Sequence, residues 1–105
     1  MSRTKRDGGR KQVKDLLIRM YGHYCWLCLK RFDRKKLTLH HVIPFRICKC
    51  TTVKNGMLLC EKCHFEKVNK VEYGTPEYDE LMKKARKNIN KHLHSRNEEV
   101  YEPDD

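Results

Sequence analysis

Two closely spaced cysteine pairs are the residues of this chain whose chemistry follows most directly from their spacing. Cys25-Trp26-Leu27-Cys28 and Cys60-Glu61-Lys62-Cys63 each present two thiols across a tight turn, as metal-binding turns do. Four thiolates suit a closed tetrahedral Zn²⁺ site, which would supply much of the free energy of folding. Buried cysteines that bind no metal are the alternative. We predict a structural zinc ion with four ligands, Cys25, Cys28, Cys60 and Cys63.

Histidines and one asparagine form a second set of chemically suitable side chains. His40 and His41 are adjacent, Asn55 precedes a glycine, and His64 directly follows Cys63. A neutral imidazole near pH 7 can accept a proton or bind a divalent ion. The alternatives are a polar outward strand face for the histidine pair, an ordinary Asn-Gly turn, and a zinc-binding role for His64.

The remaining cysteines and histidines match no motif. Cys48 and Cys50 are one residue apart, which is too close for a metal-binding turn. We expect them to be loop thiols without a role, with extra metal ligands as the alternative. We expect the other three histidines to be surface or local packing residues: His23, His92 and His94.

The elements that must position these side chains are predicted from hydrophobic periodicity. A helix is expected over residues 11–21, with one apolar face formed by Val13, Leu16, Leu17 and Met20. A strand over 37–42 separates His40 from His41, because successive strand side chains point to opposite faces. A loop over 43–56 closes at Asn55-Gly56. A second strand over 57–59 and a helix over 61–70 follow.

The strongest helix signal lies over residues 75–94. Thr75 can cap this helix and Pro76 suits its first position. Its apolar stripe consists of Tyr78, Leu81, Met82, Ala85, Ile89 and Leu93. We therefore predict three parts: a disordered basic arm over 1–10, one domain over 11–95, and a disordered acidic tail over 96–105.

Composition restricts the class of protein. The chain has 105 residues, of which 38% are hydrophobic, and its net charge is +10. Five acidic residues follow Arg96, so the excess of basic charge lies before it. Such an excess favours a nucleic-acid partner over a merely soluble surface. Neither a membrane span nor a secretory signal is recognisable, so we expect a reducing, cytoplasmic location.

The segment Cys25–Lys70 resembles the HNH endonuclease family. That family has a Cys-x₂-Cys pair, an (Asp or His)-His-x-x-Pro element, an Asn, and a Leu-Cys-x₂-Cys-His element. Here these read CWLC, HHVIP, Asn55 and LCEKCH, in the same order, over a little under half of the chain. The resemblance implies an α+β fold: a small zinc-stapled ββα-metal core, flanked here by an N-terminal and a longer C-terminal helix.

The resemblance also implies roles for the site residues. His41 would be the general base, His40 and His64 would bind the catalytic divalent ion, and Asn55 would hold the loop that aims His41. Many relatives have Asp where this chain has His40, although colicin-type nucleases of the same superfamily also have His-His. Imidazole suits softer ions, so we expect Mg²⁺ or Mn²⁺, with other transition metals as alternatives.

The activity implied is metal-dependent hydrolysis of DNA phosphodiester bonds. Nicking or double-strand cutting would leave 5′-phosphate and 3′-hydroxyl ends. Small stand-alone HNH proteins are often carried by phages, which implies a phage-infected bacterial host and terminase or packaging proteins as partners. Two alternatives remain open at this point: a non-catalytic zinc module that binds nucleic acid, and an adaptor of a DNA-packaging machine.

Overall fold

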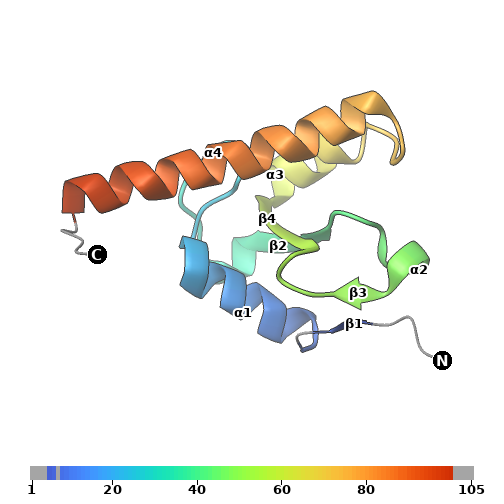
Figure 1. Ribbon diagram of the computed structural model, residues 1–105, viewed down its shortest axis with the longest axis horizontal. Helices are drawn as coiled ribbons and strands as arrows, with labels where there is room; N and C mark the ends of the chain where they lie inside the picture. Colours follow the sequence, from blue (N-terminus) through green and yellow to red (C-terminus); the bar gives the residue numbers. More distant parts are fainter. Residues whose placement is uncertain (1–4, 7, 101–105) are drawn as a thin grey trace.

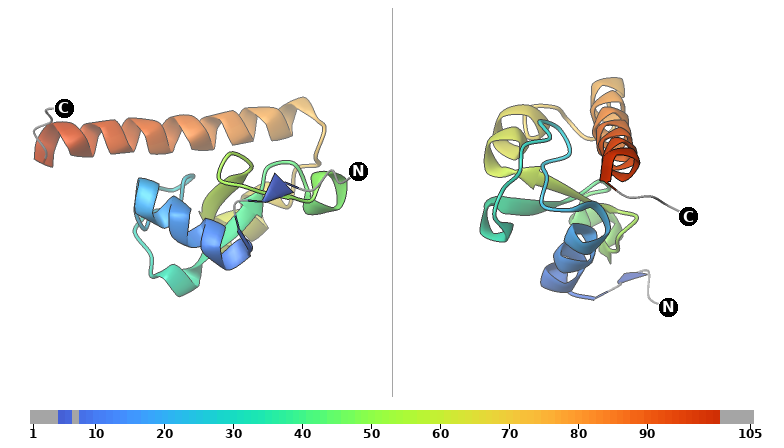
Figure 2. Two further views of the ribbon diagram at one scale, coloured as in Figure 1. Left: turned by 60° about the horizontal axis from the view of Figure 1, so that its bottom comes forward. Right: turned by 90° about the vertical axis from the view of Figure 1, so that its left-hand side faces the viewer.

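Two antiparallel strands form the centre of the computed structural model, which describes residues 5–6 and 8–100 (Figure 1). Strand β2 (Leu37–His41) pairs with β4 (Gly56–Cys60), from Leu37 opposite Cys60 to His41 opposite Gly56. All five residues of β4 are buried, so helices must cover both faces of the pair. Figure 2 shows α1 on one side of the strands and α4 on the other. The predicted α+β class is confirmed.

Helix α1 (Arg10–Tyr21) packs its apolar stripe against the strands, and its bounds lie within one residue of the prediction. Val13 and Leu17 are fully buried, whereas Met20, on the same predicted apolar face, is half exposed. Gly22 ends the helix at a φ of 93° and donates its N–H to the carbonyl of Ile18. A residue with a Cβ would be strained at that positive φ.

The loop between β2 and β4 contains more structure than its lack of periodicity predicts. It holds the single turn α2 (Phe45–Cys48) and the short strand β3 (Cys50–Thr51). The loop closes at Gly56, where an added Cβ would lie 3.1 Å from the carbonyl oxygen of Thr52 and 3.0 Å from Leu17. The predicted Asn55-Gly56 turn is confirmed, and glycine lets the chain pass this close to α1.

The segment after β4 begins as α3 (Glu61–Cys63) and widens into the π-helix η2 (His64–Val68). The N–H of Asn69 bonds to the carbonyl of His64 at 2.9 Å, five residues back. The predicted helix over 61–70 is therefore confirmed in position, but most of it is a π-helix and not an α-helix. Single π-turns often occur at functional sites, and His64 is the first residue of this one.

Helix α4 (Pro76–Val100) crosses the opposite side of the strands from α1 (Figures 1 and 2). Thr75 caps it, since its hydroxyl accepts the N–H of Tyr78 at 3.3 Å. Tyr78, Met82, Ala85 and Ile89 are buried, as the stripe predicted. The helix runs to Val100, and the predicted disorder of the tail over 96–105 stays a prediction. Residues 101–105 lie outside the described part of the chain.

The N-terminal segment contains a short strand that pairs with the loop between β2 and β4. Strand β1 (Lys5–Arg6) runs parallel to β3, with Lys5 opposite Cys50 and Arg6 opposite Thr51. The predicted disorder of the arm over 1–10 stays a prediction, and residues 1–4 and 7 lie outside the description. None of the helices in the described ranges combines the length and apolar composition that a membrane span requires.

Candidate metal centre and nuclease site

The four cysteines predicted to bind zinc converge at one place. Cys25 and Cys28 lie on the turn after α1, Cys60 ends β4, and Cys63 ends α3. Their Sγ atoms all lie within 4.8 Å of one another, and those of Cys28 and Cys60 are 4.0 Å apart. A tetrahedral zinc ion with Zn–S bonds of about 2.3 Å separates its sulfurs by about 3.8 Å. The cluster therefore fits a zinc ion.

The electrostatics of this cluster also suit a bound cation. Burial raises the pKa of the Cys63 thiol, and so does the nearby Cys25. Burial raises the pKa of Cys28 as well. Four ionised thiols this close would repel one another, whereas a bound divalent ion would stabilise all of them as thiolates. The backbone N–H of Cys63 already points at the sulfur of Cys60, at 3.4 Å, as in a metal-binding turn.

His40 and His64 form a pair of rings on one side of the strands. His40 projects from β2 and His64 from the start of η2, and their ring centroids are 5.1 Å apart, edge to face. Burial lowers the pKa of His40 to about 4, helped by the neighbouring His64 and His41. Burial also lowers the pKa of His64. Both rings are therefore neutral near pH 7, the state in which imidazole binds a metal ion.

Each of these rings has a hydroxyl partner. His40 Nε2 lies 2.8 Å from the Tyr78 hydroxyl, and His64 Nδ1 lies 2.9 Å from the hydroxyl of Thr38. One ring nitrogen of each histidine is thus engaged by the protein. The donor set that remains, two neutral imidazole nitrogens, suits a divalent transition ion.

His41 has different surroundings from its neighbour His40. It is 8% exposed, its Nε2 atom lies 3.2 Å from the Thr51 hydroxyl, and its ring meets Phe45 edge to face. Burial lowers the pKa of His41, and the positive charge of Arg10 lowers it further. The Arg10 guanidinium itself lies 5.4 Å from the centroid of the Phe45 ring. A neutral imidazole in this place can accept a proton near pH 7.

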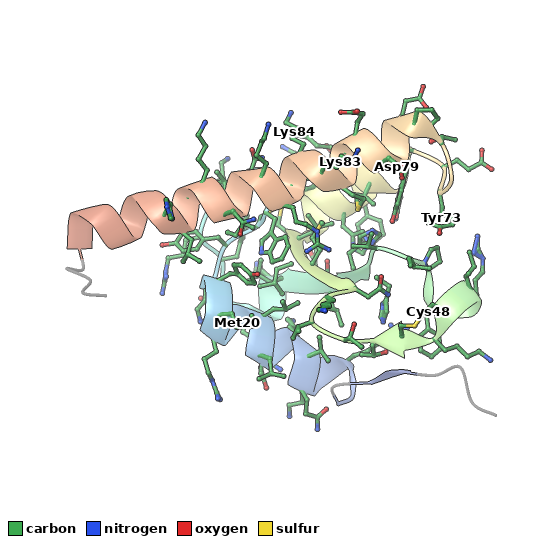
Figure 3. All side chains as sticks on the ribbon, viewed as in Figure 1. Met20, Cys48, Tyr73, Asp79, Lys83 and Lys84 are labelled. Carbon is green, nitrogen blue, oxygen red and sulfur yellow. A yellow bond between two sulfur atoms is a disulfide. The ribbon has the colours of Figure 1, made fainter. Side chains whose placement is uncertain are left out.

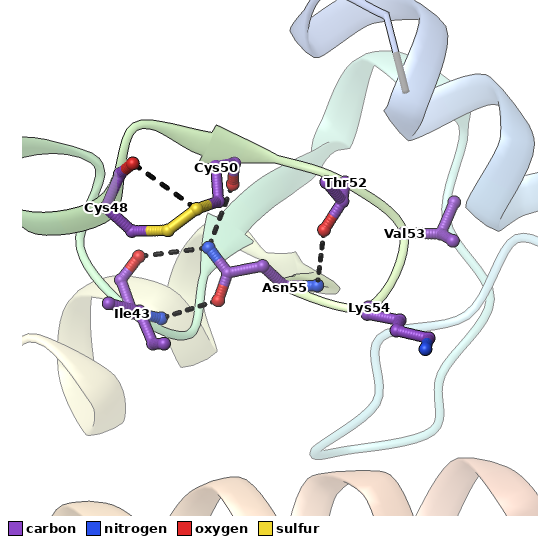
Figure 4. Close-up of a pocket in the computed structure, with 7 residues that line it drawn as sticks. All are labelled: Ile43, Cys48, Cys50, Thr52, Val53, Lys54 and Asn55. Carbon is purple, nitrogen blue, oxygen red and sulfur yellow. Dashed lines mark hydrogen bonds between the residues drawn. A yellow bond between two sulfur atoms is a disulfide. The ribbon is translucent and has the colours of Figure 1, made fainter. Parts of the chain in front are cut away.

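Asn55 ties together the two ends of the loop that follows His41 (Figure 4). It is 9% exposed, and its side-chain oxygen accepts the N–H of Ile43 at 2.8 Å. Its side-chain nitrogen donates to the carbonyls of Ile43 and Cys50, at 3.1 and 2.9 Å. Its own carbonyl accepts the N–H of Val42 at 2.9 Å. The side chain therefore fixes the backbone on both sides of α2.

Cys48 and Cys50 form a disulfide in this loop, so the expectation of unpaired loop thiols is wrong (Figures 3 and 4). Their Cα atoms are 5.1 Å apart, within the range that a disulfide spans. The backbone of Lys49 between them is left-handed, with a φ of 57°, which brings the two cysteines together. This pairing also removes both from the set of metal-ligand candidates.

Sequence reasoning missed the hydroxyl groups that contact the histidines. Thr38 lies two positions before His40 on β2, so strand alternation alone places both on one face. Tyr78 was expected only as part of an apolar stripe, and its hydroxyl was overlooked. Thr51 and Arg10 reach His41 through the fold, and nothing in the local pattern marks them. Of the other histidines, His92 packs edge-on against Tyr24, with centroids 4.6 Å apart, as local packing predicts.

The comparison with protein families gives one match. The family model described as HNH endonuclease matches residues 25–70. We found no match to the chain among curated proteins and none among solved structures. The matched range begins at the first cysteine of the zinc cluster and ends just after η2. Residues 25–70, a little under half of the chain, therefore match the HNH endonuclease family.

Proposed function

We propose that this chain is a metal-dependent endonuclease that hydrolyses DNA phosphodiester bonds, with His41 as the general base. The observation that carries the proposal is the arrangement of three histidines. The ring centroids of His40 and His64 are 5.1 Å apart, and His41 next to them has a separate neutral imidazole. A zinc module without catalysis explains the four cysteines but gives no reason for this arrangement of three histidines.

His41 is suited to take a proton from the attacking water. With its proton on Nε2 and donated to the Thr51 hydroxyl, the ring has Nδ1 left to accept the proton of the water. The depressed pKa keeps the ring neutral at pH 7, where a base must be unprotonated to act. Asn55 maintains the aim of His41 by holding the backbone of the loop that follows it.

His40 and His64 are the residues that would hold the catalytic ion. Two protein ligands leave coordination positions open for a phosphate oxygen and for water. A bound divalent ion would polarise the phosphate and neutralise the charge that develops on the leaving 3′-oxygen. Mg²⁺ and Mn²⁺ are the ions we propose, and the imidazole ligands favour Mn²⁺ of the two.

DNA is the proposed substrate because exposed basic side chains are distributed around the domain. One group lies just before β2 and another on the outer face of α4. The exposed members are Lys30, Arg31, Lys35, Lys36, Lys83, Lys84, Lys87 and Lys91. Contacts of this kind bind phosphates without reading sequence, and their strength falls steeply with salt.

Cleavage of supercoiled plasmid by zinc-loaded protein tests the proposal. Reactions with Mg²⁺, Mn²⁺, Ni²⁺ or EDTA are compared at equal ionic strength. We expect nicked or linear product with at least one added ion and none with EDTA, with 5′-phosphate and 3′-hydroxyl ends. Salt-sensitive DNA binding without cleavage under any of these conditions would instead support the non-catalytic zinc module.

A further inference from the structure

We propose that Tyr78 and Thr38 are positioning residues, which determine the ring nitrogens that His40 and His64 present to a divalent ion. The inference rests on the proposed nuclease function, because it concerns the ligands of the proposed catalytic ion. Tyr78 lies on α4, outside the segment matched by the family model. The inference therefore makes α4 a part of the site.

The argument for His40 depends on the single proton of the Tyr78 hydroxyl. That hydroxyl donates to the backbone carbonyl of Val42 at 2.6 Å. A carbonyl has no proton to give, so the phenol proton is committed there. The 2.8 Å contact between the same oxygen and His40 Nε2 must then be donated by the ring. His40 thus carries its proton on Nε2, and its Nδ1 lone pair is available.

The same argument applies to His64, whose hydroxyl partner is Thr38. The Thr38 hydroxyl donates to the backbone carbonyl of Leu59 at 2.8 Å, which commits its only proton. The 2.9 Å contact with His64 Nδ1 must therefore be donated by the ring. His64 thus carries its proton on Nδ1, and its Nε2 lone pair is available.

The orientation of each histidine ring is therefore fixed, through one hydroxyl group, by a backbone carbonyl of the strand pair. A metal-binding imidazole is neutral and has one N–H, and the partner of that N–H determines which nitrogen binds. Here a hydroxyl stands between each ring and a backbone carbonyl next to or within β2 and β4. The two rings are also held at 76° to each other by these partners. Outer partners of this type typically contribute roughly 10- to 100-fold to metal affinity.

The ring tautomers can be measured directly by ¹⁵N–¹H correlation NMR on zinc-loaded protein at pH 7.5, with no second ion added. We expect His40 as the Nε2–H tautomer and His64 as the Nδ1–H tautomer. In Tyr78→Phe only the His40 ring should become a mixture, and in Thr38→Val only the His64 ring. Tyr73→Phe is the matched control, since Tyr73 meets Tyr78 through its ring and should change neither tautomer.

Mn²⁺ titration followed by calorimetry supplies the second readout. We expect roughly 10- to 100-fold weaker binding in Tyr78→Phe and in Thr38→Val, near wild-type binding in Tyr73→Phe, and recovery in Thr38→Ser. The opposite tautomers or equal mixtures in the wild-type protein would overturn this inference even if cleavage is normal. Expected tautomers in a protein that neither binds Mn²⁺ nor cuts DNA would overturn the proposed function and, with it, the metal-facing role.

Discussion

The Asn55 side chain makes two hydrogen bonds with the backbone of Ile43. It accepts the N–H of Ile43 at 2.8 Å and donates to its carbonyl at 3.1 Å. Twelve residues separate the two positions, and the loop between them carries α2 and β3. The contact fixes the first residues after His41 to the start of β4. In the proposed mechanism the orientation of His41 therefore depends on this one amide.

Replacing that amide should cost both stability and cleavage. Asn55→Ala leaves the N–H and carbonyl of Ile43 and the carbonyl of Cys50 without their side-chain partner. The bond to the Cys50 carbonyl is buried, and leaving that carbonyl unsatisfied costs about 1–3 kcal/mol, so we expect a clear fall in melting temperature. Asn90→Ala, an exposed change on α4, is the control and should melt like the wild-type protein. Equal melting of the two variants would contradict this account of the loop.

The zinc cluster predicts different behaviour for the two groups of cysteines. Cys63→Ala removes one of four sulfurs that lie within 4.8 Å of one another, so the protein should lose zinc and unfold. Cys48→Ala breaks only the disulfide in the loop and should keep its zinc. Elemental analysis and circular dichroism measure the two effects. A folded, zinc-replete Cys63→Ala protein would show that the cluster is not the metal site.

Stability should fall as the pH is lowered from about 6.5 towards 4, in protein with zinc but no second ion. The pKa of His40 is about 4 in the folded state and 6.5 is its ordinary value. Between these values the unfolded chain binds a proton that the folded chain does not, so the free energy of unfolding falls as the pH is lowered. Urea unfolding at several pH values should show a shallower dependence for His40→Gln. If the free energy of unfolding depends on pH identically in the two proteins, the loss of stability does not come from His40.

Arg10 should influence the pH at which cleavage begins. Its positive charge helps to lower the pKa of His41, so Arg10→Gln should raise that pKa. More of the base is then protonated at any given pH, and the acidic limb of the kcat/KM profile moves to higher pH. Lys11→Gln removes the same charge from an exposed neighbour and is the matched control for weakened DNA binding. If the acidic limb moves equally in both variants, the cause is weakened DNA binding and not the pKa of His41.

Periodicity predicts the elements that bury a long stripe. The positions of Val13 and Leu17 in α1, and of Met82 and Ile89 in α4, follow from it because each stripe spans several turns. The family pattern names the cysteines and histidines because their order is distinctive. Both kinds of information are local or ordered along the chain, which is why they can be recovered from sequence.

Long-range pairing between short segments cannot be recovered in this way. Strand β1 has two residues and pairs with β3, some 45 positions later, so it shows no period of its own. The Cys48–Cys50 disulfide depends on the left-handed backbone of Lys49, which its residue type does not predict. The contact of Tyr78 with His40 depends on how α4 crosses the strands. The acidic composition of residues 96–100 predicts disorder, whereas the structure continues α4 through them.

The role of His41 is the central claim and is tested most directly by plasmid cleavage with His41→Ala. His94→Ala is the matched control, because His94 is an exposed histidine on α4. With zinc content, Mn²⁺ concentration and DNA affinity measured for each protein, we expect cleavage to fall at least about 10²-fold in His41→Ala only. Cleavage by His41→Ala at the rate of His94→Ala would contradict the assignment of His41 as the general base.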